Sequence, residues 1–266
     1  MDFLALVLAA LLVGASVAIY GQLFRGVYLS HRGKVSGDQF TRLDVYFVFI
    51  IVLYILLMSF QTLSAARPLS SRRVDTSLLI IGVLIQWSVI LLPILISFAL
   101  RKMRPTALFG LDTLRFRKVV LMGIGLLLAA LPVIALSSVV VSSIFHFSPQ
   151  RDSQEIVRVF ENAATPAQKI PIIVLAVVLA PMIEEFVFRG FVYGVLKRHF
   201  GAFASLLFSG VLFAVVHLHP PSLIPLFLLA CALTIAYEFS GSLLVPMTMH
   251  AFFNGLTLVG VFFARS

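Results

Sequence analysis

Long runs of apolar residues alternate with short polar stretches along the whole 266-residue chain. Each run has about the 20 residues that a helix needs to cross the hydrocarbon of a bilayer. The eight runs cover approximately 3–24, 45–66, 77–100, 119–146, 170–196, 202–218, 222–238 and 242–262. The period-two alternation that is typical of a membrane β-barrel does not accompany them. The pattern therefore predicts an all-α polytopic membrane protein with about eight transmembrane helices.

The polar stretch between the fourth and fifth runs, "RDSQEIVRVFENAATPAQK", has a pattern of its own. Asp152 with Glu155 three residues later resembles a helix N-terminus. Ile156, Phe160 and Ala163 would then share one face, which predicts a short helix along the membrane surface. Such a helix serves either as a connector or as a gate for a membrane-embedded substrate. The expected regions are helices one to four (1–147), this surface helix or loop (148–169) and helices five to eight (170–266).

Composition supports the membrane assignment, because 61% of the residues are hydrophobic and only 12% are charged. Soluble domains average about 45–50% apolar residues and about 25% charged residues. The net charge of +9 comes from Lys and Arg in short loops, so we expect contact with lipid headgroups and not with nucleic acid. The odd-numbered loops hold twelve of these residues, and the even-numbered loops with the C-terminus hold seven. The odd loops are therefore predicted to be cytoplasmic.

The remaining compositional signals are few. The first apolar run has no basic residue before it, so no cleavable signal peptide is expected. A single cysteine, Cys231, excludes an intrachain disulfide and is interpreted as a packing residue. The compact chain is compatible with a prokaryotic plasma membrane.

Three charged residues interrupt the fifth run, in "APMIEEFVFRGFVYG". Each costs roughly 2.5–3.5 kcal/mol at the centre of a bilayer. Glu185 and Arg189 are four residues apart on a helix, so they can form an ion pair. Glu184 points about 100° away from Glu185. One carboxylate is therefore free to face a cavity.

Two later runs add further polar side chains at comparable depth. His217 lies near the end of the sixth run, in "FAVVH", and His250 and Asn254 lie four apart in the last run, in "HAFFN". Each alone fits a helix-to-helix hydrogen bond. Glu184, however, has no partner on its own helix, and an intramembrane ionisable group indicates function. We expect these groups to converge on one polar cavity among the C-terminal four helices.

The set has the parts that peptide-bond hydrolysis needs without a covalent intermediate. A carboxylate and a histidine that hold one water can act as a general base. A second histidine and an asparagine amide are suited to stabilise the oxyanion on an attacked carbonyl.

The three segments "PMIEEFVFRG", "FAVVH" and "GSLLVPMTMHAFFNG" resemble the CPBP family of intramembrane proteases, also called the CAAX-protease or Abi family. Its signature is EExxxR, FxxxH and HxxxN or HxxxD, and all three are present in order. The resemblance covers about 168–260 and implies the eight-helix fold of the CAAX prenyl endopeptidase type.

The resemblance also implies a role for each polar residue. It makes Glu184 the water-activating base with His217 as its partner, and it places His250 and Asn254 at the oxyanion site. Glu185 and Arg189 correspond to the supporting pair. No cofactor is implied, and the expected partners are the bilayer and a peptide or membrane-protein substrate, with a lipidated one among the options.

Other functions use the same features. A zinc protease could take Glu184, His217 and His250 as ligands, although the HExxH signature is absent. Rhomboid-type serine catalysis is disfavoured because Leu207 stands where its GxSG motif needs glycine. A transporter or a non-catalytic immunity protein could carry intramembrane charges too, but the two halves of the chain show no repeat.

Overall fold

The computed structural model describes residues 3–64, 76–147, 154–163 and 165–263. The first half of the chain forms α1 (Phe3–Phe24), which continues as the π-helix η1 (Arg25–Leu29), then α2 (Arg42–Ser64), α3 (Thr76–Leu100), the short α4 (Pro105–Leu108) and α5 (Phe116–Phe145). The second half forms α6 (Glu155–Asn162), α7 (Pro166–Val174), η3 (Leu175–Leu179), α8 (Ala180–Glu185), η4 (Phe186–Tyr193), α9 (Gly194–Phe200), α10 (Ala202–Val215), η5 (Pro220–Ser222), α11 (Leu223–Ser240) and α12 (Leu244–Phe263).

Every one of the eight apolar runs is helical, and no strand occurs in the described residues. The all-α membrane fold is confirmed. Within the described residues, six helices are long and apolar enough to cross a membrane, and α10 is a shorter apolar helix. The exact number of eight spans is therefore not confirmed.

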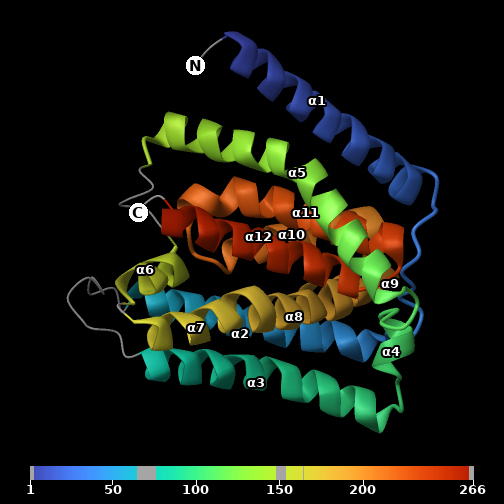
Figure 1. The fold of residues 1–266 in the computed structure, drawn as a ribbon. Helices are drawn as coiled ribbons and strands as arrows, with labels where there is room; N and C mark the ends of the chain where they lie inside the picture. The colour runs from blue at the N-terminus through green and yellow to red at the C-terminus, as the bar shows by residue number, and fades with distance from the viewer. Residues whose placement is uncertain (1–2, 65–75, 148–153, 164, 264–266) are drawn as a thin grey trace.

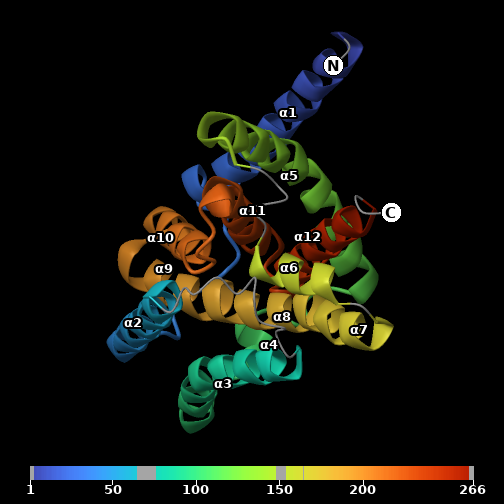
Figure 2. The same ribbon diagram turned by 90° about the vertical axis from the view of Figure 1, so that its left-hand side faces the viewer.

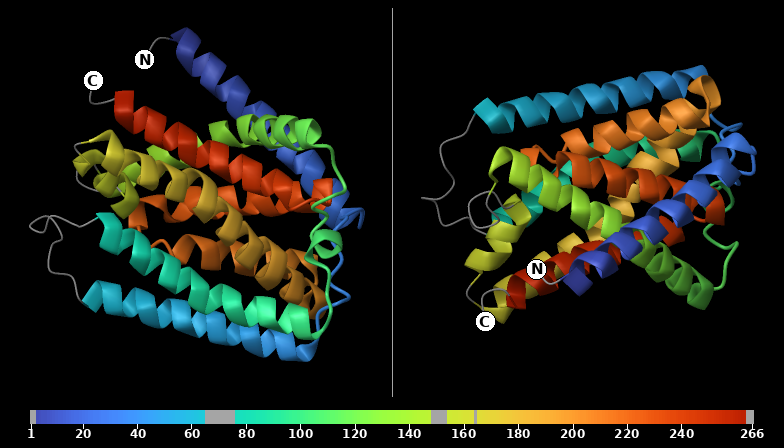
Figure 3. Two further views of the ribbon diagram at one scale, coloured as in Figure 1. Left: turned by 60° about the horizontal axis from the view of Figure 1, so that its bottom comes forward. Right: turned by 90° about the horizontal axis from the view of Figure 1, so that it is seen from above.

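The helices lie side by side around α11, the most deeply buried one (Figures 1 and 2). Leu229, Leu233 and Ala236 of α11 have no exposed surface. α5, α10 and α12 pack around it. α1 lies outside this group against α5, and α2 and α3 lie on the opposite side (Figure 3). The apolar exterior of the bundle is suited to lipid, and the protein is an integral membrane protein.

One helical rod from Pro166 to Phe200 passes through the C-terminal half of the bundle. It begins with a capping box between Thr165 and Gln168, which satisfies free backbone groups at its N-terminus. It ends at Gly201, whose φ of +80° favours glycine. Two π-helical stretches, η3 and η4, flank α8 within this rod. Such π-turns occur frequently at functional sites.

The predicted surface helix is α6, which begins at Glu155. Asp152 lies outside the described residues. Phe160 and Ala163 are buried against Ile172 and Leu258, and Ile156 packs at the edge of this cluster. The expected apolar face is confirmed. Figure 2 shows α6 between α12 and the α7 end of the rod.

Candidate active site

Glu185 lies at the end of α8 and is fully buried. Its Oε1 accepts a hydrogen bond from Nη1 of Arg189 at 2.8 Å, and the two side chains have 0% and 1% exposure. The predicted ion pair is therefore confirmed. The same oxygen lies 2.8 Å from Nδ1 of His250, which comes from α12. Glu185 thus links the rod to α12, a contact that the sequence spacing does not reveal.

Arg189 has two further partners within the bundle. Its guanidinium carbon lies 4.3 Å from the centroid of the Phe213 ring, a cation–π arrangement. Its Nη2 donates to the carbonyl oxygen of Ala230 at 3.3 Å. The buried charge is therefore held by α10 and α11 as well as by Glu185.

Phe213, the first residue of the FxxxH motif, is the centre of the site, and no role was predicted for it from the sequence. Its ring centroid lies 4.8 Å from that of His217 and 5.7 Å from that of His250. Its carbonyl oxygen lies 2.7 Å from Nδ1 of His217. The four-residue spacing in "FAVVH" was the available signal, because residues four apart on a helix lie one above the other.

Glu184 occupies the space that these rings leave. Its side chain is 22% exposed, and its Oε2 lies 3.9 Å from Nε2 of His250. The charges of Glu184 and Arg189 both act on the imidazole of His217. Among the described residues, no hydrogen-bond donor reaches Oε2 of Glu184 or Oε2 of Glu185, although both atoms are buried. The structure therefore places Glu184 of α8 near His250 of α12, and both His250 and His217, which lies just after α10, contact the Phe213 ring.

Asn254 lies one turn further along α12 and has a partner of its own. Its Nδ2 donates to the carbonyl oxygen of Ala176 at 2.8 Å. Ala176 belongs to η3, the π-helical stretch that precedes α8. The amide therefore ties α12 to the irregular part of the rod, and its role at the oxyanion stays a prediction.

The zinc alternative depends on the spacing of three ligands. Glu184, His217 and His250 are all described, and no group of three His, Cys, Asp or Glu side chains within the described ranges is placed to hold one metal ion. Both histidines do have Nδ1 engaged and Nε2 directed elsewhere. The donor chemistry suits zinc, but the three groups are not gathered as a metal site.

A second buried charge lies toward the end of α11 and was not predicted. Glu238 has no exposed surface and forms an ion pair with Lys197 of α9. It also accepts hydrogen bonds from the Tyr193 hydroxyl at 2.7 Å and from the backbone N–H of Val35 at 3.3 Å. These contacts fix the segment before α2 against η4 and α9. The only sequence signal was a glutamate inside the apolar run "TIAYEFSG".

Residues 166–256 match the family model described as type II CAAX prenyl endopeptidase Rce1-like. The matched stretch begins with α7, ends within α12 and contains all six predicted site residues. No curated protein and no solved structure matches the chain. The match confirms the resemblance seen in the three motifs, and it indicates a protease.

Proposed function

We propose that this membrane protein is a protease of the type II CAAX prenyl endopeptidase kind and that it hydrolyses peptide bonds with a water molecule activated by Glu184 and His217. The observation that carries the proposal is the meeting of Glu184 with the two imidazoles. Its carboxylate lies 3.9 Å from His250 and within electrostatic range of His217. These groups come from segments far apart in the sequence, and the Phe213 ring contacts both imidazoles.

The state of each group suits the proposed base. A carboxylate accepts hydrogen bonds only, and a buried acceptor without a donor is costly. A water bound at Oε2 of Glu184 would satisfy that atom. If Nδ1 of His217 donates to the Phe213 carbonyl, Nε2 is left as an acceptor. Glu184 and His217 can then both accept hydrogen bonds from the same water, and Glu184 takes its one proton as the oxygen attacks a carbonyl carbon.

His250 can stabilise the oxyanion only if it carries both protons. Its Nδ1–H donates to Glu185, so a second proton on Nε2 is needed for donation to substrate. That protonated form would balance the charge of the site, because Glu184 and Glu185 would then face Arg189 and His250. We infer that Glu185 orients His250 and shares its negative charge between the two cations.

The substrate in this proposal is a peptide or a membrane protein whose scissile bond reaches the depth of α8 in the bilayer. The family name refers to prenylated CAAX ends, and a lipidated chain is one form that this substrate could take. Orientation with the odd loops in the cytoplasm and a prokaryotic plasma membrane belong to the same proposal.

A zinc-dependent reaction is the second candidate, favoured by one observation. Hydrogen bonding of Nδ1 to a carboxylate or a carbonyl is how metal-binding histidines are usually oriented. His250 and His217 both show it. In that case Glu184 and the two Nε2 atoms would hold the metal, and they would have to draw closer together than they are here.

The proposal is tested with Glu184→Gln, which keeps the shape of the side chain and removes the base. Purified protein in detergent should cleave a fluorogenic peptide, or a prenylated one, and the variant should not. Asp38→Asn is the matched control, because this carboxylate is 78% exposed and belongs to a surface ion pair. Turnover by a folded Glu184→Gln protein would remove Glu184 from the role of base. A wild-type protein that cleaves neither peptide would favour the transporter or immunity alternative.

A further inference from the structure

We propose that an anionic glycerophospholipid binds in a groove between α2 and the α9–α10 corner, with one acyl chain in the groove and its phosphate at Arg42. The site lies away from Glu184, and the inference does not depend on the proposed reaction. Its grounds are the shape of the groove, the charge at its mouth and a contrasting hollow on α3.

The groove has a volume of about 420 Å³ and an almost wholly apolar lining. Val48, Leu196 and Ser205 form its buried floor. Phe49, Phe200 and Phe208 line it as well and are 65%, 62% and 49% exposed. At about 30 Å³ for each water-sized group, the space holds about fourteen such groups, which is comparable with one acyl chain.

The mouth of the groove lies where three helix ends meet, at the first turn of α2, the last turn of α9 and the start of α10. Arg42 is exposed at the start of α2 and shares a face with Val45 and Phe49, three and seven residues further on. In the part of the chain that the structure describes, no ion pair or hydrogen bond holds its guanidinium. His199 is exposed beside Phe200 on the opposite wall.

The acidic groups near the mouth are already engaged. Asp44 is buried and pairs with Arg101 at 2.7 Å. Asp38 pairs with Arg198 at 2.9 Å on the surface. Arg42 therefore remains as the cation that is available to a phosphate, and an anionic lipid is attracted to such a residue at the membrane surface.

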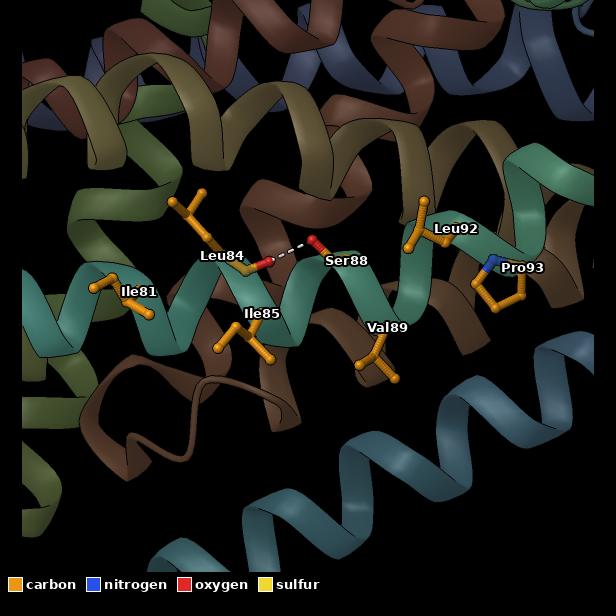
Figure 4. Close-up of a pocket in the computed structure, with 7 residues that line it drawn as sticks. All are labelled: Ile81, Leu84, Ile85, Ser88, Val89, Leu92 and Pro93. Atoms are coloured by element: carbon orange, nitrogen blue, oxygen red, sulfur yellow. Dashed lines mark hydrogen bonds between the residues drawn. The ribbon is translucent and has the colours of Figure 1, made fainter.

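A second hollow, of about 480 Å³, provides the comparison (Figure 4). It is lined by residues of α3 alone, and its one hydroxyl, that of Ser88, donates to the carbonyl oxygen of Leu84 at 2.7 Å. No charged side chain lines it. Trp87, the single tryptophan of the chain, is the neighbour of Ser88. Trp87 is partly buried and does not line the hollow, so Ile85→Trp, at a residue that lines it and is 60% exposed, is the reporter for this surface.

The test uses quenching of tryptophan fluorescence by lipids brominated on the acyl chains. Phe208→Trp in a Trp87→Phe background places the only fluorophore in the groove, and Phe49→Trp is the alternative if that variant does not fold. The protein is reconstituted in vesicles that mix brominated phosphatidylglycerol with unbrominated phosphatidylcholine, and in vesicles with the bromine on the other lipid. We expect phosphatidylglycerol to bind at the groove about fivefold more tightly, the factor that one basic residue supplies at an anionic surface.

Three comparisons decide the outcome. Arg42→Gln should abolish the preference, and Arg117→Gln, an exposed arginine in the first turn of α5, should leave it unchanged. Ile85→Trp in the Trp87→Phe background should show no preference between the two lipids. Equal binding of both lipids at the groove, a preference that survives Arg42→Gln, or the same preference at Ile85→Trp would overturn the proposal. Absence of quenching at the groove would overturn it too, because another protein surface would then cover the groove.

Discussion

A protein without the Glu185 carboxylate should have a lower melting temperature than the wild type, whereas a protein without the neighbouring Glu184 carboxylate should not. Glu185→Ala deletes the oxygen that accepts hydrogen bonds from both Arg189 and His250. Arg189 is 1% exposed and would keep only the Ala230 carbonyl and the Phe213 ring. A guanidinium cannot lose its proton to escape the cost, so it would remain buried as a charge without a counterion.

The size of the effect follows from burial. Breaking a buried ion pair from one side typically costs 3–5 kcal/mol. A domain of 150–250 residues loses about 2–4 °C in melting temperature for each kcal/mol. Glu185→Ala should therefore melt roughly 6–20 °C below the wild type. Glu184 is 22% exposed and has no hydrogen-bond donor at Oε2 in the described structure, so Glu184→Ala should melt near the wild type.

Thermal unfolding of both variants in the same detergent, followed by intrinsic fluorescence of Trp87, measures the difference. Peptide cleavage at a temperature where both remain folded should be low in each, because one variant lacks the proposed base and the other leaves His250 without its carboxylate. A Glu185→Ala protein that melts with the wild type would show that Arg189 does not depend on this carboxylate. The assignment of Glu185 as the shared counterion would then fail.

Two further predictions concern the chemistry. His250→Ala should lower kcat by about 10²–10³, the usual effect of losing one oxyanion donor, with a smaller change in KM; a loss confined to KM in steady-state assays would instead assign His250 to substrate binding. Protein stripped of metal with a tight chelator should keep its turnover if Glu184 and His217 hold the water themselves, and metal content measured beside activity checks this. Stoichiometric zinc that is lost together with activity, and restores it when added back, would favour the metalloprotease candidate.

The sequence was sufficient for the fold class and for part of the site. Apolar runs longer than about 17 residues leave little choice but helices, because backbone groups in lipid must be satisfied within the segment. The Glu185–Arg189 pair could be predicted because it depends only on helical spacing. The face of α6 followed from the same periodicity. Each of these features is local.

The missed features are contacts between helices. The hydrogen bond from His250 to Glu185 and the ring contacts of both histidines with Phe213 depend on how α10 and α12 pack against the rod. The hydrogen bond from Asn254 to Ala176 depends in addition on the π-helical backbone of η3. Helical periodicity assumes a regular helix, so it carries no information about packing between helices or about a π-helical backbone. Glu238 was overlooked for the same reason, since its partners come from η4, α9 and the segment before α2.

The π-turns of the Pro166–Phe200 rod have a consequence for insertions and deletions in this part of the chain. A π-turn is equivalent to one residue added to a regular α-helix, and each residue turns the helix by about 100°. The residues of η3 lie between the part of the rod that packs on α6 and the part that carries Glu184 and Glu185. The π-turn of η3 therefore accommodates one extra residue between these two parts of the rod. Loss of one residue within η3 would restore a regular α-helix and leave the two faces nearly in their present relation. Loss of one residue from the regular α7 would instead turn one face by about 100° relative to the other and carry both carboxylates away from the histidines.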